Sequence, residues 1–479
     1  MPELIVTATN QINVKAGANV DTGAATKTPV KTEITTSGDG ALLALSSKSD
    51  FAYNRTGGSA SSATGALIVE ANSQLKAGNS VVLDATKQAS LNSNITLENG
   101  GSATFGANSI LIGNAPLNTA GLNLNAAALT ALGQLKSLTL NSYNNIDTFG
   151  AVQFGNNKLD LTMNAAGIAG HLAKGETLAS IGASPVSSVI TAKNFTFKNT
   201  NGAAFVTPTD DSGRGLEINA GTAEVKVGNV VTQEKIVGTV NFVGVGSDDT
   251  TINGGKTEVA GYTRLAIKAD EIHVADKGAS TFNVDTITLT IGRIVGETAA
   301  DFKLKADKLE VANLTGASTT GAAGVGAKLD VVAKEITVAG DIAMTSGTLN
   351  LTSDNSLNIA SGAHLSAAST PIAFYNQTQH ANAGSITLTS NNGNVNIDAG
   401  ALVDVTSQGN ADAGTVSLVA TSGTANVVGD LRGNASGTGK GGKLNVDVKT
   451  LNDITLTNSK AVGFDESRQY RVRTGNVAI

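Results

Sequence analysis

The sequence predicts an all-β protein, built as a solenoid of parallel strands. Near its C-terminus the chain repeats itself: the pair Ile386 and Leu388 recurs as Val416 and Leu418, and once more as Leu444 and Val446. Each repeat holds short runs of alternating apolar and polar residues, separated by Gly, Asn, Ser and Asp, which is typical of strands joined by turns. A repeat of this size cannot bury its apolar face alone. Stacking each strand on its equivalent in the next repeat buries that face.

The composition supports a thin core of stacked strands. The 479 residues include 55 Gly and only 6 Pro, and aromatic residues make up 4%. Few aromatic residues argue against a thick globular core, whereas small and β-branched residues suit stacked strands. Hydrophobic residues, at 41%, are too frequent for a disordered chain. A solenoid grows in one dimension, so we expect one continuous segment over residues 1–479 despite the length.

The charge pattern excludes several classes of partner. The net charge is −6, charged residues make up 15%, and both signs are scattered. The chain therefore has no basic stripe for nucleic acid and no cationic face for an anionic membrane. The absence of cysteine excludes disulfides, thiolate metal sites and thiol nucleophiles. No run of about 18 apolar residues occurs, so we expect no direct membrane insertion.

One phrase occurs three times along the chain. Residues 11–22 (QINVKAGANVDT) match residues 394–405 (NVNIDAGALVDV), and a third copy begins at Ser356. In this match Val14 corresponds to Ile397 and Gly17 to Gly400. The recurrence near both ends predicts one architecture throughout.

Between these copies the pattern varies. We expect much of residues 22–64, which are rich in Gly, Ser, Thr and Lys, to be loop, or a coil with a long excursion, with one apolar island at 41–45. From Leu67 to Ile112 the strand signals are closely spaced. Val69, Leu83 and Leu97 are evenly spaced there, at half the distance from Val416 to Leu444. Two similar arms of one coil would give such a spacing. Residues 126–136 have helical composition.

Further strands are expected downstream, separated by turn-rich segments. The strand signals lie at 158–164, 194–199, 215–220, 223–231, 239–245, 285–292 and 301–314, with breaks at 207–214, 246–256 and 316–326. We expect residues 369–380 to be an insertion, because they separate two copies that otherwise align. Residues 463–479 differ in charge and lack a polar cap, so we expect an incomplete C-terminal end and a natural chain that continues.

Four phrases together resemble a known family. They are residues 137–154 (SLTLNSYNNIDTFGAVQF), 384–405 (GSITLTSNNGNVNIDAGALVDV), 433–448 (GNASGTGKGGKLNVDV) and 463–479 (GFDESRQYRVRTGNVAI). As a set they resemble the large exoproteins of the filamentous haemagglutinin family, over nearly the whole chain. The Asn-Pro-Asn motif of that family's N-terminal secretion domain does not occur. The resemblance therefore implies an internal or C-terminal-region fragment that lacks the secretion domain.

The resemblance implies both fold and function. Members of this family are right-handed parallel β-helices, exported by two-partner secretion through an outer-membrane transporter of Gram-negative bacteria. They act as secreted or cell-surface adhesins in cell–cell contact, biofilm or host attachment, with glycans or cell-surface receptors as candidate ligands. For about 25 residues per coil we expect roughly 19 coils and a rod on the order of 90 Å long.

Two alternatives to a structural or adhesive rod stay open. One is a β-helical polysaccharide-degrading enzyme, which needs clustered carboxylates with a basic residue nearby. The other is a scaffold of a contact-dependent toxin-delivery filament. Three or more Asp or Glu side chains that meet in one groove with an Arg or Lys would favour the enzyme. We expect the rod, not an enzyme, with no catalytic, cofactor-binding or metal-binding residue and no cofactor.

The individual chemical motifs favour structural roles. The aspartate pairs Asp210–Asp211 and Asp248–Asp249 stand beside Gly or Ser and are expected to serve turns. None of the histidines has metal-ligand spacing to another, so all four are expected to be solvated: His171, His273, His364 and His380. The sequence GKGGK at 439–443 is read as a turn because it lacks the spacing of a phosphate loop.

The remaining polar signals are periodic. No calcium-binding nonapeptide repeat occurs, and we attribute the seven N-x-[ST] sequons, such as those at Asn54, Asn94, Asn194 and Asn350, mostly to chance. Asn, Thr and Val residues at equivalent places should stack between neighbouring coils, packing or hydrogen-bonding there. Recognition is expected from the excursions at 22–64, 207–214, 246–256 and 369–380, because loops on a rigid scaffold carry binding sites.

Overall fold

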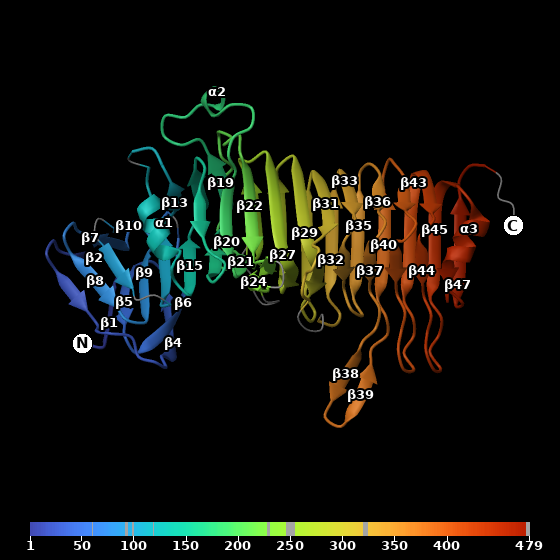
Figure 1. Cartoon of the computed structure of the whole chain (residues 1–479), viewed down its shortest axis with the longest axis horizontal. Coiled ribbons are helices and arrows are strands. Elements are labelled where there is room, and N and C mark those ends of the chain that lie inside the picture. The colour runs from blue at the N-terminus through green and yellow to red at the C-terminus, as the bar shows by residue number, and fades with distance from the viewer. Residues whose placement is uncertain are drawn as a thin grey trace. The chain divides into compact units, whose positions relative to one another are not determined.

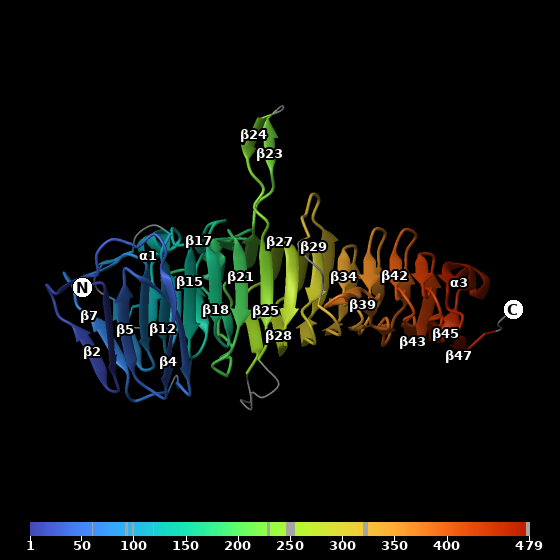
Figure 2. The same ribbon diagram turned by 90° about the horizontal axis from the view of Figure 1, so that it is seen from below.

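The computed structural model describes residues 1–59, 61–91, 94–97, 100–117, 119–227, 230–245, 254–319 and 324–475. It confirms an all-β fold with a large, mostly parallel sheet (Figures 1 and 2). Contacts divide the chain into two compact units. The N-terminal unit comprises Met1–Val240 and Asp248–Leu265, and the C-terminal unit comprises Asn241–Ser247 and Ala266–Ile479. The chain passes between them within β25 (Thr239–Val243) and β27 (Arg264–Ala275).

In the C-terminal unit the strands form three parallel ladders. The first comprises β28 (Lys277–Asn283), β30 (Asp301–Ala306), β32 (Lys328–Ala333), β35 (Thr348–Ser353), β40 (Ser385–Ser390), β43 (Thr415–Val427), β45 (Lys443–Leu451) and β47 (Ser467–Val472). The second comprises β29 (Thr286–Gly296), β31 (Lys308–Asn313), β33 (Glu335–Val338), β36 (Leu357–Ile359), β41 (Val395–Ile397) and again β43. The third comprises β34 (Asp341–Ala343), β37 (His364–Ser366), β42 (Leu402–Asp404), β44 (Asp430–Arg432) and β46 (Ala461–Val462).

The register of these ladders is the one that the repeats predict. Ile386 pairs with Val416, and Val416 pairs with Leu444. All three side chains are buried, while the residues between them alternate outward. Along the chain the spacing between hydrogen-bonded partners on neighbouring strands is not constant: it is 20 residues for Asp330 with Asn350, 38 for Asn358 with Asn396 and 45 for Asn194 with Thr239. Turns and excursions therefore absorb the differences in length.

The N-terminal unit is also built largely of parallel ladders. Its first principal ladder comprises β12 (Ser102–Ala107), β15 (Ser137–Ser142), β18 (Asp160–Asn164) and β21 (Asn194–Lys198). The second comprises β13 (Ile110–Gly113), β16 (Ile146–Phe149), β19 (Gly167–His171) and β26 (Lys256–Ala260), and β14 (Leu122–Leu124) also pairs with β13. The third comprises β17 (Gln153–Gly155), β20 (Ser188–Ala192) and β22 (Gly215–Ala220). Two short ladders precede them: β2 (Gln11–Val14), β7 (Ala66–Val69) and β10 (Gln88–Leu91); and β3 (Asn19–Asp21), β8 (Gln74–Ala77) and β11 (Asn94–Leu97).

The segment 22–64 differs from the expected loop excursion, because it is rich in strands. It contains β4 (Val30–Ser37), β5 (Ala41–Ser46) and β6 (Ser49–Thr56). The apolar island at 41–45 lies in β5, which is buried throughout and pairs antiparallel with both β1 (Glu3–Ala8) and β9 (Ser80–Ala85). Apolar residues on consecutive positions suit a strand that is covered on both faces.

The three recurring phrases adopt one local structure. Each forms two short strands joined by a bend: β2 and β3, β36 and β37, and β41 and β42. The bend places Gly17, Gly362 and Gly400 at φ of 80°, 86° and 84°, a left-handed conformation that glycine adopts without a Cβ clash. In the intervening strands β7 and β8 the equivalent position is Asn72, at φ 63°. Asparagine is a residue that tolerates this region.

The even spacing of Val69, Leu83 and Leu97 does not relate stacked strands, as the spacing between C-terminal repeats does. These three residues lie in β7, β9 and β11, which belong to different ladders. Val69 pairs instead with Leu91, and Leu83 with Phe105. The repeat here therefore runs from Val69 to Leu91, so the shorter interval is not half of a repeat, and the interpretation as two similar arms of one coil is wrong for Leu83 and Leu97.

The remaining elements leave the ladders. The expected helix is present as α1 (Ala126–Leu132), which Asn125 caps by accepting a hydrogen bond from the Ala128 N–H at 3.1 Å. Segment 369–380 forms an antiparallel hairpin of β38 (Pro371–Phe374) and β39 (Gln377–His380), outside the parallel ladders (Figure 1). A second hairpin joins β23 (Val225–Val227) and β24 (Val230–Gln233), and two further helices are α2 (Leu178–Ile181) and α3 (Ile454–Lys460).

Candidate functional site

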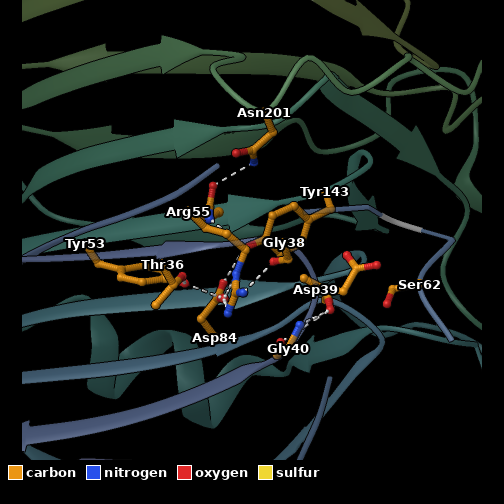
Figure 3. A network of polar contacts seen from close by, with 12 residues as sticks. Thr36, Gly38, Asp39, Gly40, Tyr53, Arg55, Ser62, Asp84, Tyr143 and Asn201 are labelled. Atoms are coloured by element: carbon orange, nitrogen blue, oxygen red, sulfur yellow. Dashed lines mark hydrogen bonds and ion pairs between the residues drawn. The ribbon is translucent and has the colours of Figure 1, made fainter. Parts of the chain in front are cut away.

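A buried polar network in the N-terminal unit is centred on Asp84 (Figure 3). The Arg55 Nε donates to Asp84 Oδ2 at 2.7 Å, and its Nη2 lies 2.7 Å from the same oxygen. Tyr53 and Tyr143 donate to the two carboxylate oxygens at 2.7 and 2.8 Å. Arg55 Nη1 donates to the Gly38 carbonyl at 2.8 Å. The carboxylate thus receives hydrogen bonds from three side chains.

This network is structural. The side chains of Arg55 and Asp84 are 2% and 0% exposed, so a ligand has no access to them. Burial and the Asp84 charge raise the pKa values of Tyr53 and Tyr143, which keeps both phenols protonated as donors. A Cβ at Gly106 would lie 1.7 Å from Asp84 Oδ1, so glycine is needed beside the carboxylate. The network joins β6 and β9 and cannot act on a solute.

A second cluster in the same unit surrounds His171, the last residue of β19. His171 Nε2 lies 3.2 Å from Asp147 Oδ1 and Nδ1 lies 2.8 Å from Asp210 Oδ1. The ring stacks on Phe149, with centroids 4.8 Å apart. Ser109 Oγ donates to the second oxygen of Asp147 at 3.1 Å. Burial alone lowers the pKa of His171, but the hydrogen bonds to the two carboxylates outweigh it, and the pKa lies above its ordinary value.

Asp210 belongs to residues 199–214, which we call the strap because they leave the ladders and contact several of their strands. Asn201 Nδ2 donates to Asn141 Oδ1 at 2.8 Å. Asn145 exchanges two hydrogen bonds with the backbone of Val206, and the Ser212 N–H donates to the Gly261 carbonyl. The ion pair of Asp210 lies between these backbone anchors.

A third cluster, in the C-terminal unit, surrounds the buried Glu271 of β27. Arg293 Nε donates to Glu271 Oε1 at 2.7 Å, and His273 Nε2 lies 3.2 Å from Oε2. His273 Nδ1 lies 3.9 Å from Glu297. The described contacts therefore join two carboxylates in this cluster and two around His171.

Charges of alternating sign continue from Arg293 along the third ladder. Arg293 pairs in register with Asp341, and Asp341 with His364. Burial raises the pKa of Asp341, although the charges of His364 and Arg293 oppose this. Burial also acts to raise the pKa of Asp404, but His364 and the Thr406 N–H outweigh it and the pKa is lowered. These contacts relate neighbouring rungs, as salt bridges in a ladder do.

The structure also contains grooves beside α1. One, of about 720 Å³, is lined by α1 residues and by Phe149, Val152 and Gln153. A second, of about 430 Å³, lies between α1 and the side chains of Leu91, Ile95 and Phe105. Both exist because a short alanine-rich helix stands where other repeats place a strand.

The histidines divide into two groups, which corrects the expectation that all four are solvated. The His171 side chain is 16% exposed and His273 is 23% exposed, and both are bound to carboxylates. The His364 side chain is 42% exposed and pairs in register with Leu402, as the alignment of the repeats predicts. His380 ends β39 and is half-buried, with its ring against Gly409.

The first aspartate pair has two functions. Asp211 accepts a hydrogen bond from the Gly213 N–H at 2.7 Å, the turn role that the sequence predicts. Asp210 instead binds His171, a contact that the sequence pattern does not indicate. Asp248–Asp249 and most of segment 246–256 lie outside the described residues, as do residues 320–323 and 476–479.

The other motifs occupy structural positions. GKGGK at 439–443 runs directly into the strand β45, not into the helix that a phosphate loop requires. The sequon residues Asn194 and Asn350 donate to Asp160 and Asp330 in the neighbouring strands, both at 2.7 Å. Asn54 is exposed, and the side chain of Asn94 is outside the described set.

The hairpin β38–β39 is one of the expected recognition segments and is largely exposed. Tyr375 at its tip is 94% exposed and has φ 54°, a position that hairpin turns usually give to Gly, Asn or Asp. Residues 365–379 carry no charged side chain. The hairpin therefore presents an uncharged surface with an aromatic tip.

Within the described residues, no group of three or more His, Cys, Asp or Glu is arranged to hold a metal ion. No helix in the described part of the chain is long and apolar enough to cross a membrane. Comparisons with models of known families, with curated proteins and with solved structures found no match.

Proposed function

We propose that this chain is a right-handed parallel β-helical segment of a secreted bacterial adhesin of the filamentous haemagglutinin type. In this proposal the three ladders of the C-terminal unit are the three sides of successive coils. The segment serves as a stiff structural and adhesive rod on the surface of a Gram-negative cell, exported through an outer-membrane two-partner secretion transporter. The resemblance of the four sequence phrases supports the family, and the ladders support the mechanical role.

One observation carries the mechanical part of the proposal: asparagine side chains bond from rung to rung. Asn396 Nδ2 donates to Asn358 Oδ1, and Asn426 Nδ2 donates to Asn396 Oδ1, both at 2.7 Å. The three asparagines are register partners in neighbouring strands of the parallel ladder. Thr424 and Thr450 form a similar contact at 2.6 Å. Continuous side-chain and main-chain ladders resist bending, because bending stretches every bond on one side.

The adhesive part of the proposal rests on the hairpin β38–β39. It is held on regular ladders at its base, and its tip presents Tyr375 to solvent. An aromatic ring beside amide side chains such as Gln377 and Gln379 suits a neutral polar ligand, for example a glycan of a cell surface.

The test is a binding screen with the purified full chain against a glycan array and whole cells of several bacterial and host types. We expect saturable binding that is lost when residues 371–380 are replaced by a short Gly-Ser linker. The Gly-Ser replacement of residues 437–442, a turn elsewhere in the same unit, is the matched control and should bind normally. A well-folded chain that binds nothing would overturn the adhesive role.

The mechanical role has its own test. Small-angle X-ray scattering should give an elongated particle with a longest dimension on the order of 90 Å or more, and electron microscopy should show a narrow rod. A compact, near-spherical particle would overturn the β-helical proposal whatever the outcome of the binding screen.

A further inference from the structure

The cluster around His171 has a geometry that only a protonated imidazole satisfies. Both ring nitrogens lie within hydrogen-bond distance of a carboxylate oxygen, at 3.2 Å for Asp147 and 2.8 Å for Asp210. A carboxylate only accepts, so each nitrogen must donate. Neutral imidazole carries one N–H and imidazolium carries two. The geometry therefore requires the charged ring.

Loss of the second proton leaves one nitrogen lone pair facing a carboxylate. Asp147 is 18% exposed, is held by Ser109 and lies on a ladder strand, whereas Asp210 is 46% exposed and lies on the strap. An unpaired carboxylate costs less where water reaches it. The single remaining N–H therefore stays with Asp147, and Asp210 separates from the ring.

We propose that His171 is a pH-sensitive fastener of the strap, which holds residues 207–211 against β19 when its ring is charged and releases them when the ring is neutral. The release is local, because the backbone contacts of Val206 and Ser212 remain on either side. The exposed parts of the strap thus have a closed and an open conformation. This inference does not depend on the proposed adhesive function.

The surroundings of the ring determine the direction of the pH effect. Asp147 faces it from β16 and Asp210 from the strap, with Phe149 stacked on one side. Two other titratable groups of the neighbouring segments carry no free charge: Arg214 of the strap pairs with Glu176 at 2.9 Å, and burial raises the pKa of Tyr262, which contacts Thr148. Glu258 lies on β26, the strand paired with β19, and Asp211 follows Asp210 and binds the Gly213 N–H. Lys174 follows shortly after His171 along the chain.

The pKa of His171 is raised in the folded protein. The fastener therefore contributes fully below about pH 6.5, the unperturbed value, and is lost as the pH rises through the raised value. The equilibrium constant for opening of the strap is therefore larger at high pH than at low pH. By linkage, each unit by which Asp210 raises the pKa of His171 corresponds to an about tenfold difference in this constant.

The chain contains no cysteine, so Thr209→Cys provides a single attachment point for a nitroxide label on the strap. Electron paramagnetic resonance of the full chain should show an immobile label at pH 6 and a mobile one above the His171 midpoint. The same midpoint should appear in the NMR titration of His171, which His171→Gln identifies among only four histidines. A label at Asn376→Cys, on the hairpin β38–β39, is the control for general pH effects.

Three variants test the mechanism. His171→Gln should abolish the mobility transition, since glutamine does not titrate. Asp147→Asn should shrink the transition and move its midpoint to lower pH, because one stabilising charge is gone and the asparagine amide can donate to a neutral Nε2, which leaves the remaining N–H for Asp210. Asp210→Asn should flatten it. The proposal is overturned if His171→Gln retains the transition, or if His171 titrates in the wild type without any change in label mobility.

Discussion

The two units of this protein achieve the same strand ladders by different means. In the C-terminal unit like residues stack on like, as Leu351, Leu388 and Leu418 do in the core. The N-terminal unit includes antiparallel pairing of β5, two helices, and charged clusters around Asp84 and His171. Regular repeats supply most partners by position, although the C-terminal unit also contains the buried cluster around Glu271. Irregular repeats need specific polar contacts to fix their register.

The largest effect should come from the buried ion pair of the N-terminal unit. Asp84→Asn removes the charge that neutralises buried Arg55, and we expect a loss of about 3–5 kcal/mol in the free energy of unfolding. The measurement is urea unfolding followed by circular dichroism, because the chain has no tryptophan. Asp307→Asn breaks an exposed pair with Lys334 and should have little measurable effect. Equal effects of the two substitutions would contradict the special role of Asp84.

The core of the C-terminal unit gives the next largest effect. Leu388 is fully buried between Leu351 and Leu418 in the neighbouring strands. Leu388→Ala should cost about 2–5 kcal/mol, through lost burial and the cavity left behind. Its neighbour Thr387 points outward, and Thr387→Ala should change the free energy of unfolding by less than about 0.5 kcal/mol. If the two variants were equally stable, the assigned register would be wrong.

The asparagine ladder allows a finer comparison within one unit. Asn396 both donates and accepts along the ladder, whereas the described contacts give Asn426 one ladder bond. Asn396→Ala should therefore cost about 1–2 kcal/mol and Asn426→Ala about half as much. Thermal or urea unfolding of the two variants measures the difference. A larger cost for Asn426 would show that the ladder is not the unit of stabilisation.

The smallest effect concerns a surface contact between repeats. Glu70 binds the Lys15 ammonium at 2.9 Å and the Ala16 N–H at 3.0 Å, which together lower its pKa to about 2. Because the pKa is lowered, the contact stabilises the fold above the ordinary value of 4.5 and is lost as the pH falls through about 2. The free energy of unfolding of Glu70→Gln should differ slightly from that of the wild type near neutral pH. This difference should vanish as the pH falls through about 2. A difference that persists there would contradict this.

The sequence predicted the ladder register where repeats are alike. The equivalence of Ile386, Val416 and Leu444, and that of His364 with Leu402, is found in the strand pairing. The alternation of apolar and polar residues along each strand, and turn residues at the same places in each repeat, determine such pairing from nearby residues alone. The stacked asparagines follow from the same reasoning.

The sequence did not predict contacts whose spacing has no period. Arg55 and Asp84 are 29 residues apart, and His171 and Asp210 are 39 apart. Each contact depends on the path of one irregular segment and not on a periodic pattern of residues. The strand β5 was missed for a related reason: its apolar run was too short to distinguish a buried strand from an apolar patch in a loop.

The varying length of the repeats has a consequence for how the protein tolerates insertions and deletions. Neighbouring strands match by position, although paired residues lie 20 apart at Asp330 and Asn350 and 38 apart at Asn358 and Asn396. An in-frame deletion of residues 386–415 would bring Val416 onto Leu349, in the place that Ile386 now occupies. Deleting one residue inside β40 would instead turn its buried side chains outward. Recombination between similar repeats could therefore lengthen or shorten this gene with less damage than the loss of a single codon.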